Sequence, residues 1–126
     1  LWKTDIDVPD VCSPLVTDKY VLLLAHGMLA CFDRAVGEPA PDKDEPRQPL
    51  WEEDLGAEVS SSPSQVGNLV YLFSEEGQAW IMEPQADGCK RVGELPMGEP
   101  VRSSPAFRPG RIYIRGQEHL TCIGTK

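Results

Sequence analysis

One pattern occurs three times in this chain, and the repeat limits the possible folds more than any other feature of the sequence. Each copy begins at a Ser-Pro step, at Ser13-Pro14, Ser62-Pro63 and Ser104-Pro105. An apolar run, a glycine and a second apolar run follow in every copy. The prolines lie 49 and then 42 residues apart, so the copies have similar lengths and predict one structural unit used repeatedly.

Each unit reads as four short strands. In the second copy, residues 69–73 are a nearly continuous apolar run, which is typical of a strand buried on both faces. The turn sequences Gly67-Asn68 and 75–77 lie on either side of it. Residues 79–82 predict a third strand, and a Trp-bearing segment predicts the fourth. A four-stranded unit of about 40–45 residues is the signature of a β-propeller blade. We therefore expect an all-β fold of antiparallel four-stranded blades.

The blade boundaries follow from the repeat. Residues 1–6 and 50–55 both begin Leu-Trp and predict fourth strands, whereas the third equivalent, near residues 89–95, has no Trp. We expect one propeller fragment over residues 1–126. Its parts are the fourth strand of a preceding blade with a connection (1–10), blade one (11–59), blade two (60–100) and the first three strands of the last blade (101–126).

Three blades cannot close a ring, because closed propellers contain roughly 4–8 blades. We expect the fragment to self-associate through its open blade faces. We also expect strand exchange as a second route, in which residues 1–6 complete the last blade of their own chain or of a partner. Two copies would form a six-bladed ring with twofold symmetry.

Blade one contains an insertion at residues 39–49. Its proline and charge density prevents it from pairing as a strand, so we expect an exposed and poorly ordered loop. Loops of this kind carry binding sites in many proteins, and a functional role for this one stays open.

The charge and hydropathy of the chain argue against two classes of partner. A net charge of −8 disfavours nucleic acid, because phosphate binding needs a surplus of Lys and Arg. No apolar run approaches the roughly 18 residues of a membrane span. No signal peptide is readable, and a start at Leu1 in mid-pattern suggests an excised part of a larger protein.

The four cysteines have no paired metal-ligand spacing, so we predict no zinc site. Cys31 and Cys122 hold the same place in their repeats, which predicts small buried hydrophobic residues of the third strand. A disulfide between Cys12 and Cys89 stays open. His26 and His119 fall at different repeat positions, which does not favour a shared metal site, and with two histidines no Ser-His-Asp arrangement is readable. We therefore predict no catalytic or metal site and expect both histidines to be solvent-exposed.

The repeat resembles the pyrroloquinoline-quinone (PQQ)-like propeller repeat. The family's unit is a Ser-Pro step, a short strand, a Gly/Asp turn, an apolar strand, Gly, an L-x-x-x-D strand and G-x-x-x-W. The first copy matches at Ser13-Pro14, Asp18, 20–24, Gly27, Leu29, Asp33, Gly37 and Leu50-Trp51; the second at Ser62-Pro63, Gly67, Gly77, Glu83 and Gly88, with Glu for Asp and no Trp; the third at Ser104-Pro105, Gly110, Gly116 and Leu120.

The resemblance assigns structural roles to several residues. Trp2 and Trp51 are equivalent, and in the family such residues pack between blades. Trp80 stands where the other copies have small residues, so it either fills a gap between blades or faces outward. Three glycines, Gly27, Gly77 and Gly116, mark the turn between the second and third strands.

The resemblance implies two functions. Some members are quinoprotein dehydrogenases, marked by adjacent cysteines and calcium ligands, and this sequence has no Cys-Cys pair. Others resemble the lipoprotein scaffold of the outer-membrane barrel-assembly machine and bind no cofactor. We expect a non-catalytic scaffold without a cofactor, binding a protein or ligand, in a periplasmic, secreted or envelope-associated bacterial parent. The alternative is a fragment of a PQQ-dependent dehydrogenase, which would bind PQQ and calcium.

Overall fold

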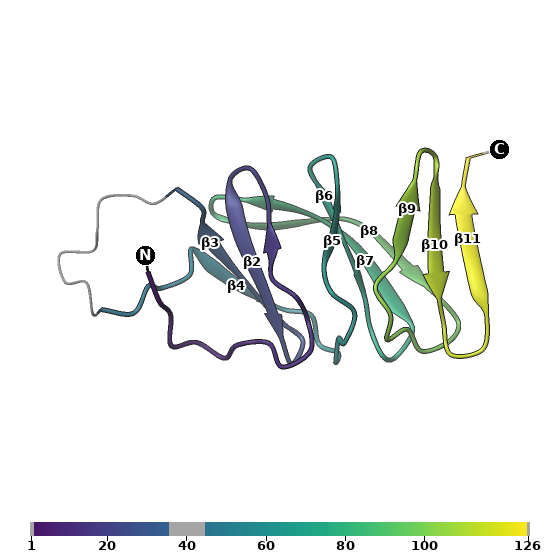
Figure 1. Ribbon diagram of the computed structural model, residues 1–126, viewed down its shortest axis with the longest axis horizontal. Helices are drawn as coiled ribbons and strands as arrows, with labels where there is room; N and C mark the ends of the chain where they lie inside the picture. Colours follow the sequence, from purple (N-terminus) through teal and green to yellow (C-terminus); the bar gives the residue numbers. More distant parts are fainter. Residues whose placement is uncertain (1, 36–44, 126) are drawn as a thin grey trace.

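The computed structural model describes residues 2–35 and 45–125, which form three antiparallel sheets (Figure 1). Blade one consists of β1 (Leu15–Val16), β2 (Tyr20–Ala25), β3 (Met28–Asp33) and β4 (Trp51–Asp54). Blade two consists of β5 (Ser64–Val66), β6 (Leu69–Phe73), β7 (Gln78–Gln85) and β8 (Gly88–Pro96). Blade three consists of β9 (Ala106–Arg108), β10 (Arg111–Arg115) and β11 (Leu120–Gly124). The predicted all-β fold of antiparallel blades is confirmed.

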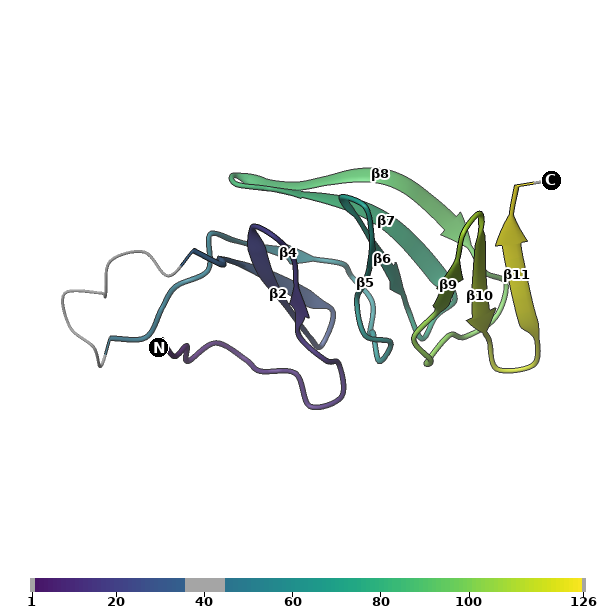
Figure 2. The same cartoon turned by 45° about the horizontal axis from the view of Figure 1, so that its top comes forward.

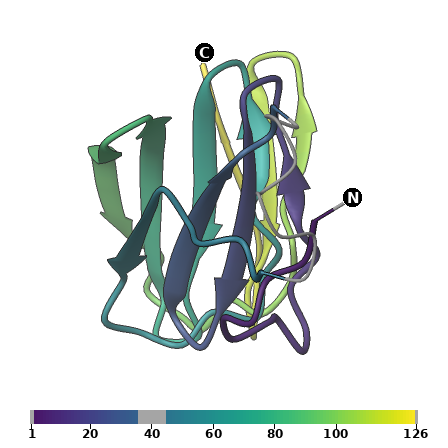
Figure 3. The ribbon, with the colours of Figure 1, turned by 90° about the vertical axis from the view of Figure 1, so that its left-hand side faces the viewer.

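The blades stack side by side in chain order, and the strands within each sheet also follow chain order. The N-terminus lies beside blade one and the C-terminus beside blade three, at opposite ends of the stack (Figure 1). Figure 3 looks along the stack from its blade-one end. In the described ranges, no helix is long and apolar enough to cross a membrane.

Apolar residues from neighbouring blades form the core, because alternate side chains of each strand point to opposite faces. Between blades one and two, the buried cluster contains Cys12, Leu22, Leu24, Leu29, Cys31, Leu55, Val59, Val70, Leu72, Trp80 and Met82. Between blades two and three, it contains Phe73, Ala79, Val101 and Ile114. Blade two therefore buries both faces, as its apolar runs predict.

The Ser-Pro step of each repeat links neighbouring blades. The backbone N–H of Ser13 donates to the hydroxyl of Ser62 at 2.9 Å, and the N–H of Ser62 donates to the hydroxyl of Ser104 at 3.0 Å. The same bond therefore recurs one blade further along. We call this series the serine ladder.

The residue before each ladder serine fixes its own blade. The hydroxyls of Ser61 and Ser103 donate to the carbonyls of Phe73 and Arg115, both at 2.8 Å. These bonds tie the blade entry to the end of the second strand. In blade one the equivalent Cys12 instead donates weakly to carbonyls of the next inter-blade connection.

The fourth strand predicted at residues 1–6 is not observed, since the structure has no strand in residues 2–10. A fourth strand needs a third strand beside it, and the nearest sheet, blade one, already has its own β4. The segment instead covers the outer face of blade one, where Trp2 stacks on Phe32 with ring centroids 5.2 Å apart. Closure of blade three by the N-terminus of the same chain is not observed, because the termini lie at opposite ends.

Most of the predicted insertion, residues 39–44, lies outside the described residues. The remainder contains no strand but contacts the N-terminal segment. The backbone N–H of Arg47 donates to the carbonyl of Lys3 at 2.7 Å, and its guanidinium lies 5.3 Å from the ring centroid of Trp2. This end of the insertion is therefore fixed against the protein.

The β7–β8 hairpin is longer than the other hairpins and extends over blade one (Figure 2). Its pairing register shifts between Ile81 and Met82, where β8 accommodates an extra residue. Arg91 of β8 lies 3.2 Å from Glu53 of β4, so the outer strands of the two blades are joined by an ion pair.

Candidate functional site

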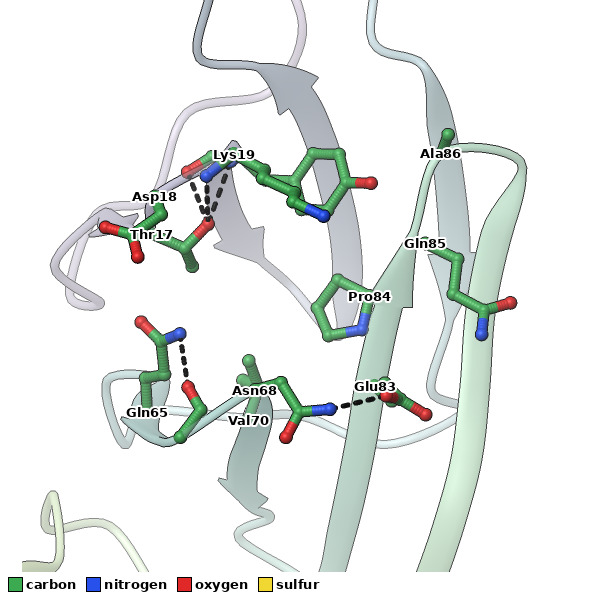
Figure 4. Close-up of a pocket in the computed structure, with 12 residues that line it drawn as sticks. Thr17, Asp18, Lys19, Gln65, Asn68, Val70, Glu83, Pro84, Gln85 and Ala86 are labelled. Atoms are coloured by element: carbon green, nitrogen blue, oxygen red, sulfur yellow. Dashed lines mark hydrogen bonds between the residues drawn. The ribbon is translucent and has the colours of Figure 1, made fainter.

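A cleft of about 630 Å³ lies between blades one and two, beside the turns that join the first and second strands of each blade (Figure 4). We call it the polar cleft. Its wall on blade one is the β1–β2 turn, residues 17–20. Blade two contributes Gln65, Gly67, Asn68 and Val70 from β5, β6 and their turn, and Glu83, Pro84, Gln85 and Ala86 from the end of β7.

Hydrogen bonds within each wall fix the polar groups of this cleft. The amide of Asn68 donates to the carboxylate of Glu83 at 2.5 Å, joining the β5–β6 turn to β7 (Figure 4). The amide of Gln65 donates to the carbonyl of Gly67 at 2.7 Å. On the other wall, the hydroxyl of Thr17 accepts the N–H of Tyr20 at 2.8 Å. The cleft thus presents amide, hydroxyl and carboxylate groups on turns held by rigid strands.

A second cleft, of about 620 Å³, lies between blades two and three. We call it the apolar cleft. It is lined by Val66, Tyr71, Phe107, Ile112 and Ile123 together with the β9–β10 turn. Tyr71 and Phe107 meet edge to face, with centroids 5.4 Å apart. Val66 and Ile123 keep 44% and 37% of their surface exposed, so apolar surface is open to a ligand here.

The two clefts occupy equivalent positions one repeat apart, but their chemistry differs. The repeat places Phe107 where blade two has Gln65, and Gly110 where it has Asn68. The carboxylate of Glu83 is replaced by Gly124. Because these substitutions lie outside the buried core clusters, the polarity of the two clefts can differ while the blades keep the same fold. Sequence reasoning missed these residues, although the signal was available as repeat positions where the copies disagree.

The cysteines are free thiols and are poor nucleophiles where they are buried. Burial raises the pKa of Cys31 to about 12, with smaller contributions from Cys89 and Asp33. Burial also raises the pKa of Cys89 to about 11, and a nearby carboxylate, Glu53, adds to the shift. Cys12 and Cys89 are both free thiols in this structure.

The two histidines lie in different blades, and each faces one glutamate. His26, in the β2–β3 turn, lies 4.0 Å from Glu58. His119 lies 3.1 Å from Glu99. No group of three or more His, Cys, Asp or Glu in the described residues is placed to hold a metal ion. The equivalent carboxylates are also separate, since Asp33 accepts the N–H of Ala35 and Glu83 accepts Asn68.

The predicted packing tryptophans occupy different environments. Trp51 donates its indole N–H to the carbonyl of Gln85 at 2.7 Å, which joins blade one to blade two. Trp80 is 3% exposed and fills the core between the same blades. Trp2 covers Phe32 on the outer face of blade one.

Cys31 and Cys122 also differ, although they hold the same repeat position. Cys31 is fully buried against blade two, whereas Cys122 is exposed. The next-blade face of blade three carries no sheet in the described chain, so the core environment expected for Cys122 is not formed there.

The three predicted turn glycines are all buried between strands two and three. Gly27 and Gly77 have positive φ angles of 77° and 83°. A Cβ atom at either position would collide with a backbone carbonyl of the following connection. At Gly116 a Cβ atom would instead meet the carboxylate of Glu99.

No protein-family model matches the sequence, and no curated protein matches it. A solved structure that is similar is BamB from Moraxella catarrhalis, at 16% identity and a TM-score of 0.50. The match covers 88% of this chain and 41% of that protein, so this chain spans about two fifths of its length. The similarity confirms the PQQ-like β-propeller resemblance at the level of fold.

Proposed function

We propose that this chain is a non-catalytic propeller domain that binds an extended peptide segment of a protein partner across its inter-blade clefts. The observation that carries the proposal is the pair of equivalent clefts with opposite chemistry. A peptide lying across the blades would place a polar group in the first cleft and an apolar side chain in the second.

The composition of each cleft suits this role. Backbone amides of an extended peptide need donors and acceptors, which Gln65, Asn68 and Gln85 supply in the polar cleft. The exposed Val66 and Ile123 offer surface whose burial favours binding of an apolar side chain. Volumes near 600 Å³ lie within the roughly 300–1,000 Å³ typical of binding pockets.

Selection from a random heptapeptide phage library on the immobilised 126-residue chain tests the proposal. Enriched peptides would be synthesised and titrated by calorimetry against the parent chain and two cleft variants, Val66→Asp and Asn68→Ala. We expect Val66→Asp to weaken binding about tenfold, because a contact worth one buried aliphatic side chain is lost.

The matched control is Val92→Asp, which places the same charge at an exposed valine of β8 outside both clefts. It should leave the affinity unchanged. The proposal fails if no peptide is enriched, or if the enriched peptides bind both cleft variants as tightly as the parent chain. The alternative function, a fragment of a quinoprotein dehydrogenase, is tested separately by titrating PQQ with calcium. We also propose that the longer protein containing this chain is located in the cell envelope.

A further inference from the structure

The outer face of blade three is exposed and basic, although the chain as a whole is acidic. The pairing register places Arg108, Arg111 and Arg115 on this face with Tyr113 and Cys122. All three arginines are exposed, and Leu120, beside Arg115, is 69% exposed. We call this surface the arginine face. β11 is the edge strand of the described sheet and has one side unpaired.

Two repeat positions that meet at each junction between blades indicate which surface would complement the arginine face. One position is at the end of the second strand, and the other is in the connection that leads to the next blade. At the first junction, Leu24 at the end of β2 and Val59 of the connection pack in one apolar cluster. At the second junction, the equivalent Phe73 and Val101 do the same.

Continuing the repeat to a third junction changes the chemistry of both positions together. The equivalent of Leu24 and Phe73 is Arg115, and the equivalent of Val59 and Val101 is Asp10 of the N-terminal segment. Two apolar pairs are thus followed by an Arg and an Asp, which are complementary in charge. Similarly, Tyr20 and Glu83 line the polar cleft, and their third-junction equivalents are Arg111 and Asp33.

The N-terminal segment covers the face of blade one on which a preceding blade would pack. Trp2, Thr4 and Ile6 are half-buried, while Lys3, Asp5 and Asp7 are exposed, the alternation of a strand. The insertion contacts the same face, since Arg47 donates to the carbonyl of Ala35 at 3.2 Å.

The serine ladder has complementary ends. In the described chain, the hydroxyl of Ser13 accepts no N–H from a preceding blade, and the N–H of Ser104 donates to no following serine. A second molecule placed head to tail would supply both groups, with Ser104 of one copy donating to Ser13 of the other.

We propose that the arginine face docks onto the blade-one end of a second copy of this chain. Residues 2–6 of that copy pair with the free edge of β11, and Asp10 faces Arg115 across the junction. Two such junctions would close a six-bladed ring with twofold symmetry, since each copy carries Arg115 at one end of the stack and Asp10 at the other. The proposal is independent of the peptide-binding function.

Charge reversal tests the junction. Light scattering behind size exclusion, over a range of concentrations, would compare the parent chain with Arg115→Asp, Asp10→Arg and the double variant. We expect the parent to reach twice its 13.9 kDa mass. Each single reversal should weaken association about tenfold or more, because like charges then face each other. The double variant should recover most of the lost affinity.

Lys90→Asp is the matched control, because it makes the same charge change at an exposed position of β8, outside the proposed junction. It should leave the association constant unchanged. Larger head-to-tail oligomers that dissociate on single reversal and return in the double variant also support the junction. A parent chain that stays monomeric up to about 1 mM overturns it. An oligomer insensitive to both reversals overturns it equally.

Discussion

The hydroxyl of Ser62 accepts the backbone N–H of Ser13 at 2.9 Å, so the entry to blade two holds the entry to blade one. The bond joins residues 49 positions apart in sequence and recurs at the next junction. The serine of the Ser-Pro step therefore has a structural role, because its hydroxyl accepts the N–H of the equivalent serine in the preceding blade.

Ser62→Ala tests the contribution of this bond to stability. The variant removes the acceptor but leaves the Ser13 N–H accessible to water, so we expect a loss of about 0.5–1 kcal/mol in the free energy of unfolding. Urea denaturation measures it. Ser104→Ala should cost a similar amount, because it removes the equivalent bond. Ser64→Ala is the control, since its hydroxyl makes only a long contact of 3.4 Å. Equal stability of all three variants and the parent would contradict the ladder.

Trp51→Phe separates the packing of the indole from its hydrogen bond. The aromatic ring is kept, but the donor to the Gln85 carbonyl is lost, and we expect a loss of about 1 kcal/mol in urea unfolding. Gln85→Ala is the control, because the acceptor is a backbone carbonyl that the substitution preserves. A free energy of unfolding for Trp51→Phe equal to that of the unsubstituted chain would show that the bond has no role.

Gly77→Ala tests the close approach of the β6–β7 turn to the following connection. A Cβ atom there would lie 2.6 Å from the carbonyl oxygen of Glu99, at a φ of 83°. Gly98→Ala is a matched control, with a φ of 78° and nothing within 4 Å of its Cβ position. The control should cost about 1–2 kcal/mol through backbone strain. Gly77→Ala should cost about 1–3 kcal/mol more, because of overlap. Similar thermal midpoints for the two variants would refute the prediction.

Glu99 makes stability depend on pH in the acidic range. The backbone N–H of Glu118 and then the interaction with His119 lower the pKa of its carboxyl below the ordinary 4.5. The folded state therefore binds a proton less readily than the unfolded state. The stabilisation is complete above pH 4.5 and declines as the pH falls through the lower folded value. Urea midpoints measured between pH 3 and 7 should fall less steeply at the acidic end for Glu99→Gln than for the parent. Glu76→Gln, at an exposed turn, should follow the parent curve.

The thiols should react in a definite order. Cys122 is exposed, whereas Cys31 is fully buried with a pKa raised to about 12. Ellman's reagent at neutral pH should therefore modify Cys122 first and Cys31 only after unfolding in urea. Peptide mass mapping identifies the labelled residue. Modification of Cys31 as fast as Cys122 in the native protein would contradict the buried position. Slower reaction of Cys122 at high protein concentration would accompany docking at the arginine face.

The repeat was sufficient to predict blades, because the apolar runs and turn glycines that specify the strands of one blade all lie within one repeat unit. Gly27 and Gly77 illustrate this, since the turn geometry they require is local. Features that depend on a neighbouring sheet were not predictable in the same way. Cys122 has the pattern of a core residue but no sheet covers it in the described chain. Residues 1–6 have the pattern of a strand, but a strand requires hydrogen bonds from a neighbour.

The clefts show the same limit. Whether Gln65 or Phe107 faces a cavity depends on how two blades meet, which no single repeat specifies. Their difference is visible in the sequence only once equivalent positions are compared across the junctions.

The serine ladder also bears on how such a chain can change length during evolution. Each rung uses one N–H from one repeat and one hydroxyl from the next, so a duplicated repeat brings both halves of the bond it needs. Tandem duplication or deletion of a whole unit therefore leaves no polar group stranded at the new junction. Recombination could therefore change the number of blades without further substitutions at the hydrogen bonds that join them.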